Sequence, residues 1–278
     1  MFLLPAISLS QINQRFHENQ RPLYEFGFGA INLDIPYYPG SKENQNRTIP
    51  FFWPVYRGKY LRLDQEGTRA KLTDSRFFEL GFSLGFSFPI NSDDNPVRQG
   101  LKDIDYVVEI GPRLIFRLIS RSTWQKLNFN LSARAAYEVM RNDLNSYHIG
   151  ITGGPSISYW IYLNKKKTTS LFTSASMLFG DSDYNNFFYG VGPKNLRNLS
   201  SSTLYQANSG EISRRIFTRI ATNIGRTLQV FVGGFYSDLS KSSNLNGPLI
   251  EQKKNRGLAF GFLWNFYQSE ETVSVYGD

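Results

Sequence analysis

Carboxylate and amide side chains are concentrated at Ser92-Asp93-Asp94-Asn95, where neighbouring carboxylates could share a hard cation such as calcium. The glycine and the terminal glutamate of an EF-hand loop are missing, and Asp and Asn are also ordinary turn formers. The two histidines, His17 and His148, are too few and too far apart for a metal site. We therefore predict a structural turn here and no metal or cofactor, with a calcium loop as the alternative.

His148 is the candidate base for a hydrolase of the Ser-His-carboxylate type. The sequence has no Gly-x-Ser-x-Gly elbow, and the nearby Ser146 and Ser156 lie in no distinctive context. We predict that the protein is not an enzyme and that His148 lies at the rim of a strand.

The third candidate function is ion selection. It requires that alternate positions of the expected strands face a confined lumen. The charged residues at these positions are Glu25, Glu79, Glu109, Arg113, Arg117, Lys126, Arg134, Arg215 and Arg219. Cations outnumber carboxylates in this set, and a ring of cations in a narrow lumen favours anions. The alternative is mutual ion pairing that fills the barrel, so an anion-preferring pore and a closed barrel both remain open.

The elements that position these residues alternate with a period of two. One side of the stretch 77–89 carries large apolar residues and the other carries Glu79 with glycine and serine. We expect lipid contact from this apolar set and its counterpart near the end, namely Phe78, Leu80, Phe82, Leu84, Phe86, Phe88, Phe260, Phe262, Trp264 and Phe266. A strand with large apolar residues on one face and small or polar residues on the other is typical of a transmembrane barrel.

Composition supports this interpretation and excludes several classes. The chain has 278 residues, 41% of them apolar and 15% aromatic, a net charge of +8 and no cysteine. The mean hydropathy of −0.35 and the lack of a run of about 18 apolar residues exclude a polytopic helical membrane protein. Scattered Lys and Arg without a recognition motif indicate no nucleic-acid partner.

We expect an all-β, transmembrane antiparallel β-barrel of about twelve strands, with ten as the alternative. The expected strands cover 22–33, 49–57, 59–64, 68–73, 77–89, 107–119, 124–140, 148–162, 170–179, 212–224, 228–236 and 257–266. Long and short connections alternate, as outer-membrane barrels require. Pro50 and Pro54 predict a distorted second strand, with the 59–73 hairpin standing partly off the wall.

The two ends of the chain are expected to lie outside the barrel. The first residues are apolar and end with Ser8 and Ser10, spaced like a cleavage signal, so they are either a truncated signal peptide or an ordered N-terminus. Gly261, Trp264 and Phe266 have a spacing like that read by barrel-assembly machinery. The predicted divisions are 1–10 signal remnant, 11–21 periplasmic segment, 22–266 barrel and 267–278 periplasmic polar tail.

Several short pieces resemble a known family in both order and spacing. They are Tyr38-Pro39-Gly40-Ser41, Tyr56-Arg57-Gly58, Ser92-Asp93-Asp94-Asn95 with Arg98 and Gly100, Glu109-Ile110-Gly111-Pro112, and Phe188-Tyr189-Gly190-Val191. Together they resemble the MipA/OmpV family of outer-membrane proteins. This resemblance implies an outer-membrane location in Gram-negative bacteria and a scaffold role that joins a lytic transglycosylase to a peptidoglycan synthase.

Three functional hypotheses follow. The first is an envelope scaffold that contacts peptidoglycan-remodelling enzymes, with outer-membrane lipid as its surroundings. The second is a small-solute pore that prefers anions. The third, which we favour least, is an outer-membrane hydrolase that depends on His148.

Overall fold

The computed structural model describes residues 20–57, 61–64, 67–70, 77–119, 122, 124–140, 145–193, 204–225 and 227–274. The predicted signal remnant, residues 1–10, lies outside the described residues, as do residues 11–19 of the predicted N-terminal segment.

The described chain is almost entirely strand, as the alternation predicts. Ten strands of 10 to 17 residues form the wall: β2 (Tyr24–Pro36), β3 (Asn44–Arg57), β6 (Phe78–Ser87), β7 (Tyr106–Ile119), β8 (Gln125–Val139), β9 (Ser146–Tyr162), β10 (Thr169–Gly180), β11 (Gly210–Ile224), β12 (Leu228–Asp238) and β13 (Lys254–Gln268). Four short strands complete the set: β1 (Gln20–Pro22), β4 (Leu61–Asp64), β5 (Gly67–Ala70) and β14 (Thr272–Ser274).

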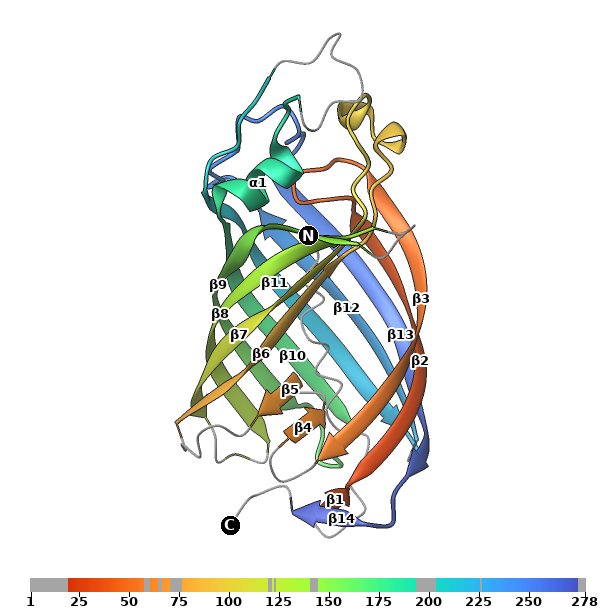
Figure 1. Cartoon of the computed structure of the whole chain (residues 1–278). Coiled ribbons are helices and arrows are strands. Elements are labelled where there is room, and N and C mark those ends of the chain that lie inside the picture. The colour runs from red at the N-terminus through yellow and green to blue at the C-terminus, as the bar shows by residue number, and fades with distance from the viewer. Residues whose placement is uncertain are drawn as a thin grey trace.

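The wall strands form one antiparallel sheet that curls into a barrel (Figure 1). The order is β5-β4-β3-β2-β13-β12-β11-β10-β9-β8-β7-β6, which makes twelve strands within the described residues. The short β5 lies beside β6, so the two ends of the sheet meet there. The all-β barrel is confirmed: ten strands are long enough to span, and the β4-β5 hairpin adds two short ones.

Pro50 and Pro54 do not distort β3, contrary to the expectation. The register between β2 and β3 is unbroken from Tyr24↔Tyr56 to Pro36↔Asn44. Flanking bonds pair residues 37 with 43 and 23 with 57, so the odd-numbered residues of β3 bond to β2. Both prolines occupy even positions, where the missing N–H would point away from β2 and no bond to that strand is lost.

The outer face of the barrel carries most of the residues predicted to contact lipid. Exposed fractions range from 37% for Leu80 and Phe262 to 60% for Phe260. The other exposed members of this set are Phe78, Phe82, Leu84, Trp264 and Phe266. Phe88 differs from the prediction, because it is only 8% exposed and packs into a buried cluster with Phe86 at its edge. It follows the last residue of β6, where the alternation of the strand has ended.

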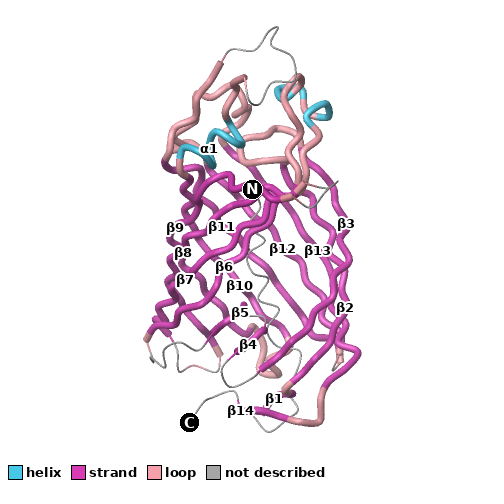
Figure 2. Tube along the Cα trace, viewed as in Figure 1, coloured by secondary structure: helices cyan, strands magenta, loops and turns pink. Residues whose placement is uncertain are grey.

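The two ends of the barrel differ, as Figure 2 shows. At one end, which we call the terminal end, β1 pairs with β14, and the connections from β7 to β8, β9 to β10 and β11 to β12 are short. The predicted polar tail is therefore partly ordered: β13 extends to Gln268, and residues 272–274 form a strand.

The opposite end, which we call the loop end, carries long, folded connections. They include the helix α1 (Ser182–Tyr189) and two 3₁₀ turns, Ser92–Asp94 and Pro96–Arg98. In the described part of the chain, no helix has the length and apolar character needed to cross a membrane.

Candidate functional site

Four connections at the loop end pack together into what we call the cap: the described parts of 37–43, 88–105, 181–209 and 239–253. Its buried apolar members are Tyr38, Ile90, Leu101, Ile104, Tyr184, Phe188, Tyr189, Val191, Ala207 and Leu249. They rest on one inward residue near the loop end of each strand from β7 to β11: Val107, Ala136, Ile149, Leu178 and Ile212. The cap is therefore a small hydrophobic core built across this end of the barrel.

Hydrogen bonds tie the connections of the cap to one another. The Tyr38 hydroxyl donates to the Leu249 carbonyl at 2.9 Å, and the Tyr189 hydroxyl donates to the Pro39 carbonyl at 3.1 Å. Arg98 donates from Nη1 to the Phe188 carbonyl at 3.2 Å. Each bond joins two different connections, so the segments that resemble the MipA/OmpV family hold the cap together.

Gly40 and Ser41 form the corner of the first connection. Gly40 has a φ of +98°, which favours glycine. Its N–H donates to Asn255 Oδ1 at 2.7 Å, and Asn255 Nδ2 donates to the Ser41 carbonyl at 2.8 Å. Asn95 Nδ2 donates to Ser41 Oγ at 3.2 Å. The turn is thereby hydrogen-bonded both to the 88–105 connection and to β13.

The Ser92-Asp93-Asp94-Asn95 segment forms a turn. Ser92 and Asn95 are fully buried, whereas Asp93 and Asp94 are exposed. The Ser92 N–H donates to Asp103 Oδ1 at 2.8 Å. Among the described residues, no three His, Asp or Glu side chains are grouped closely enough to hold a metal ion.

Burial controls the ionisation of the cap tyrosines. Desolvation raises the pKa of Tyr38, Tyr184 and Tyr189 well above the ordinary value for a phenol, near 10. The charge of Glu109 raises the pKa of Tyr184 further. These phenols stay neutral and can donate their hydrogen bonds throughout the neutral range.

Inside the barrel, each of the three predicted lumen carboxylates pairs with an arginine. The three pairs are Glu25 with Arg57, Glu79 with Arg117, and Glu109 with Arg134. Arg57 is the one member of these pairs that the sequence did not single out for the lumen. The three separate ion pairs lie on β2 and β3, on β6 and β7, and on β7 and β8.

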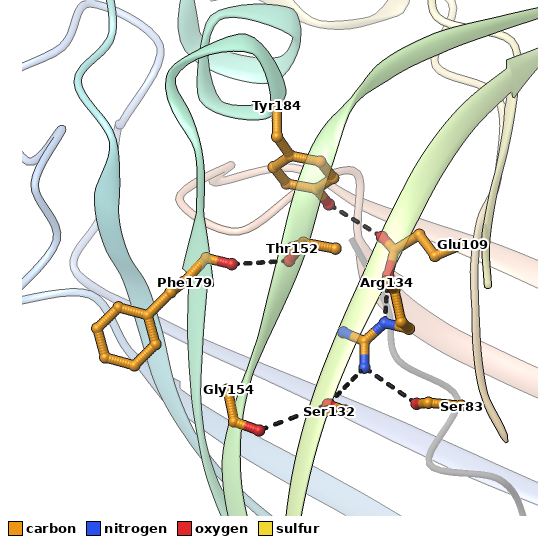
Figure 3. Close-up of polar contacts among 8 residues, drawn as sticks. All are labelled: Ser83, Glu109, Ser132, Arg134, Thr152, Gly154, Phe179 and Tyr184. Carbon is orange, nitrogen blue, oxygen red and sulfur yellow. Dashed lines mark hydrogen bonds and ion pairs between the residues drawn. The ribbon is translucent and has the colours of Figure 1, made fainter. Parts of the chain in front are cut away.

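Glu109 links the barrel wall to the cap (Figure 3). Arg134 Nε donates to Glu109 Oε2 at 2.9 Å, and the Tyr184 hydroxyl of α1 donates to Glu109 Oε1 at 3.1 Å. Arg134 Nη1 also donates to Ser83 Oγ at 3.1 Å and to Ser132 Oγ at 3.0 Å. Glu109 is fully buried, so this network is a desolvated contact between strand and helix.

The remaining predicted lumen cations lie on β7, β8 and β11. Arg215 stacks over the Phe235 ring at 4.7 Å from its centroid, and Arg219 lies 5.9 Å from the Phe172 centroid. Both arginines are buried, whereas Arg113 and Lys126 are half-buried. The structure thus brings aromatic rings and arginines together in the interior, a combination that the sequence pattern does not predict.

The interior also contains a cluster of apolar side chains, a feature that the sequence interpretation missed. Its buried residues come mainly from β2, β11, β12 and β13: Ile31, Leu33, Ile35, Phe88, Ala221, Phe231 and Leu263. Inward residues of β3 pack against them: Ile49, Phe51 and Trp53. We call this set the apolar wall.

Inward glycines make room for the aromatic rings of the apolar wall. A Cβ added at Gly261 would lie 2.7 Å from a ring carbon of Phe231, its register partner on β12. The Phe235 ring covers its own partner, Gly257, in the same way. The small inward residues that suggested a wet lumen therefore serve ring packing here. Strand register is the signal that reveals this, because each ring meets its glycine across the ladder.

His148 lies at the rim and faces outward. Its ring packs against Tyr137 at 5.4 Å between centroids, and the residue is exposed. His17 lies outside the described residues.

Comparison with known proteins bears on this barrel and cap. The family model described as MltA-interacting protein MipA matches residues 27–266. The chain belongs to the MipA family. The match runs from β2 to β13 and contains the whole cap, while β1 and β14 lie beyond it. This MipA-family chain is a β-barrel protein of the bacterial outer membrane. A search of curated proteins finds no match.

Solved structures similar to this MipA-family barrel are also outer-membrane proteins. An outer-membrane channel from Pseudomonas putida F1 has a TM-score of 0.49 and 10% identity, covering 91% of this chain and 100% of its own. The monoaromatic hydrocarbon channel CymD has a TM-score of 0.37 and 8% identity, covering 96% and 92%. A FadL homologue from Pseudomonas aeruginosa has a TM-score of 0.35 and 8% identity, covering 91% of each chain. Identities this low concern the fold alone.

Proposed function

We propose that this protein is a closed outer-membrane scaffold whose terminal end faces the periplasm and contacts peptidoglycan-remodelling enzymes. The observation that carries the proposal is the cap, a hydrophobic core across the loop end that Tyr184 and Glu109 join to the barrel wall. In outer-membrane barrels the long loops face outward and the short turns face the periplasm. A barrel closed on its outer side leaves its periplasmic end as the surface for partners.

The terminal end has an ordered surface suited to that role. The Leu23 N–H donates to the Glu271 carbonyl at 2.8 Å, and the Ser269 N–H donates to the Tyr24 carbonyl at 2.9 Å. These bonds hold the tail against the start of β2, and Glu270 and Glu271 stay exposed. The family name, MltA-interacting protein, supports a lytic transglycosylase as one partner, and the resemblance described above supports a peptidoglycan synthase as the other.

The test is binding of the purified, detergent-solubilised protein to a purified lytic transglycosylase and a purified peptidoglycan synthase. We expect Glu270→Lys with Glu271→Lys to weaken binding at least about tenfold, the scale of a lost charged contact at an interface. Lys102→Glu, an exposed change in the cap, is the matched control and leaves binding unchanged. Absence of binding to both enzymes by the folded wild type refutes the scaffold.

The alternative is an anion-preferring pore. It is supported by the lumen set defined from the sequence, in which six cations face three carboxylates. Discrete anion-selective steps from the wild-type protein in a planar bilayer would favour this alternative. Silence from a folded barrel favours the closed scaffold.

We also infer that the protein is not a hydrolase. His148 packs against Tyr137 and is exposed, whereas Glu109 and Arg134 of the interior polar network are buried. A lipid-ester hydrolysis assay with purified wild type and His148→Ala tests this inference. Turnover by the wild type that His148→Ala abolishes would refute it.

A further inference from the structure

The wall between β3 and β6 is built differently from the rest of the barrel. β3 bonds to β2 along its whole length, and β6 bonds likewise to β7. On its other side, within the residues that the structure describes, β3 pairs through Tyr56 and Arg57 with the short β4. Among the described strands, β6 has a ladder with β7 alone. We call the boundary between β3 (44–55) and β6 the seam.

The seam edge of β3 has fewer backbone N–H donors than an ordinary strand edge, because proline occupies two of its positions. The even-numbered residues of β3 point their backbone groups away from β2, toward the seam. Pro50 and Pro54 hold two of these positions and have no N–H to leave unsatisfied. An unpaired N–H in hydrocarbon is strongly unfavourable, so an edge next to lipid is more stable without those donors.

Apolar side chains close the seam on the lumen side. Ile49, Phe51 and Trp53 of β3 belong to the apolar wall, and so does Phe88, just beyond the end of β6. Phe86, on the outward side of β6, packs against Phe88 with 5.1 Å between ring centroids. The contact between the two edges is therefore made by side chains. Such contacts are non-directional, so the two edges can separate without loss of backbone hydrogen bonds. Separation of any other pair of wall strands would break a ladder of backbone hydrogen bonds.

Hydrocarbon flanks the seam outside as well. On the outer face, Phe52 of β3 is 76% exposed and Leu84 of β6 is 53% exposed. In the outer membrane these side chains contact lipid acyl chains. The apolar wall lies behind β3, so apolar side chains line the path past this edge from bilayer to interior, while the inward face of β6 carries Glu79, Ser83 and Ser87.

We propose that the seam is a lateral entry through which lipid acyl chains reach the apolar wall of the interior. The cap covers the loop end, so this entry needs no opening of the cap. The occupant is an acyl chain because the outer face of the seam, at Phe52 and Leu84, and the apolar wall behind β3 are hydrocarbon. The proposal does not depend on the scaffold function.

The experiment uses the four tryptophans, Trp53, Trp124, Trp160 and Trp264, as reporters. Three single-tryptophan variants retain Trp53, Trp160 or Trp264, with the other three replaced by phenylalanine. Each is reconstituted in vesicles of phosphatidylcholine with brominated acyl chains, which quench tryptophan on close contact, and in unbrominated vesicles. Heat-dependent migration on gels verifies that each variant is folded.

The two other reporters are built-in controls. Trp264 is 50% exposed on the outer face and is expected to be quenched. Trp160 faces the interior from β9, is 6% exposed and is expected to keep its emission. The proposal expects Trp53 to lose emission to an extent close to that of Trp264. Emission from Trp53 as well preserved as that from Trp160 overturns it.

A second pair of variants locates the route. In the Trp53-only protein, Phe86→Ala with Phe88→Ala removes the apolar closure and should increase quenching of Trp53. Phe78→Ala with Phe82→Ala, outward residues on the same strand, is the matched control and should leave it unchanged. Equal effects from the two double variants also overturn the proposal.

Discussion

At the scale of single residues, Glu109 is the position where the strands, the helix and the interior charges meet. It is fully buried, it accepts hydrogen bonds from Arg134 and Tyr184, and Arg134 is itself 2% exposed. Removing one partner of a buried ion pair leaves the other as an uncompensated charge. This makes Glu109 more consequential than any exposed charge of the barrel.

We expect Glu109→Gln to lower the free energy of unfolding by about 3–5 kcal/mol, the typical cost of breaking a buried pair from one side. The measurement is urea unfolding of the protein in lipid vesicles. Glu211→Gln, which loses the exposed ion pair with Arg214, is the control and should change stability little. Equal effects from the two variants would contradict a structural role for the buried pair.

The inward glycines have a similar, purely steric importance. We expect Gly257→Ala to destabilise the barrel by about 1–3 kcal/mol, because the new methyl group meets the Phe235 ring. Phe235→Ala in the same protein should remove this additional cost, which a double-mutant cycle measures. Gly192→Ala, where a methyl group meets nothing within 4 Å, is the control. A cycle with no coupling would contradict the packing of the ring on the glycine.

At the scale of elements, α1 and the connections around it form a folded unit whose stability depends on neutral phenols. The pKa values of Tyr38, Tyr184 and Tyr189 are raised by burial. A group with a raised pKa in the folded state contributes its full stability below the unfolded pKa, near 10 for tyrosine. That contribution falls as the pH rises above about 10.

We therefore expect the cap to be stable from neutral pH to about pH 10 and to unfold at higher pH. Absorbance of ionised tyrosine during an alkaline titration measures this, with the cap tyrosines ionising late and cooperatively. Ionisation of all tyrosines in a single ordinary step would contradict the burial of the cap phenols.

The alternation of backbone hydrogen bonding along β3 explains how this strand tolerates proline. We expect Thr48→Pro to be accepted, because even positions of β3 direct the N–H toward the seam. Arg47→Pro removes a bond to Leu33 and should cost roughly 1–3 kcal/mol, the penalty of an unsatisfied backbone group. Unfolding in urea compares the two variants. Equal destabilisation by both would contradict the bonding pattern derived for β3.

At the scale of the whole molecule, the cap determines whether the interior communicates with the outside. We expect the wild type to be silent in a planar bilayer. Replacement of residues 181–209 by a short Gly-Ser linker should produce anion-selective steps, because cations predominate in the lumen set. Arg113→Glu in that protein should weaken the anion preference.

Reversal potentials in a salt gradient measure these changes in selectivity. Conductance of the wild type equal to that of the linker variant would show that the cap does not close the barrel. Silence of a folded linker variant would show that the interior itself is blocked.

The sequence alone determined the class of fold and the strand plan, because a period of two repeats over many strands. The outer face is continuous enough for Leu80, Phe82 and Leu84 to be assigned to it without a structure. The segment Tyr38-Pro39-Gly40-Ser41 and its relatives also pointed to the family before any contact was known. These are local signals, each readable within one segment.

The tertiary structure decided what the local signals leave open. That Phe231 covers Gly261, that Tyr184 reaches Glu109, and that the missing N–H of Pro50 falls on the seam edge all depend on strand register or on contacts between distant segments. Inward glycine has the same appearance in sequence whether it borders water or an aromatic ring. Only the position of the neighbouring strand distinguishes the two, because the ring that fills the space belongs to another part of the chain.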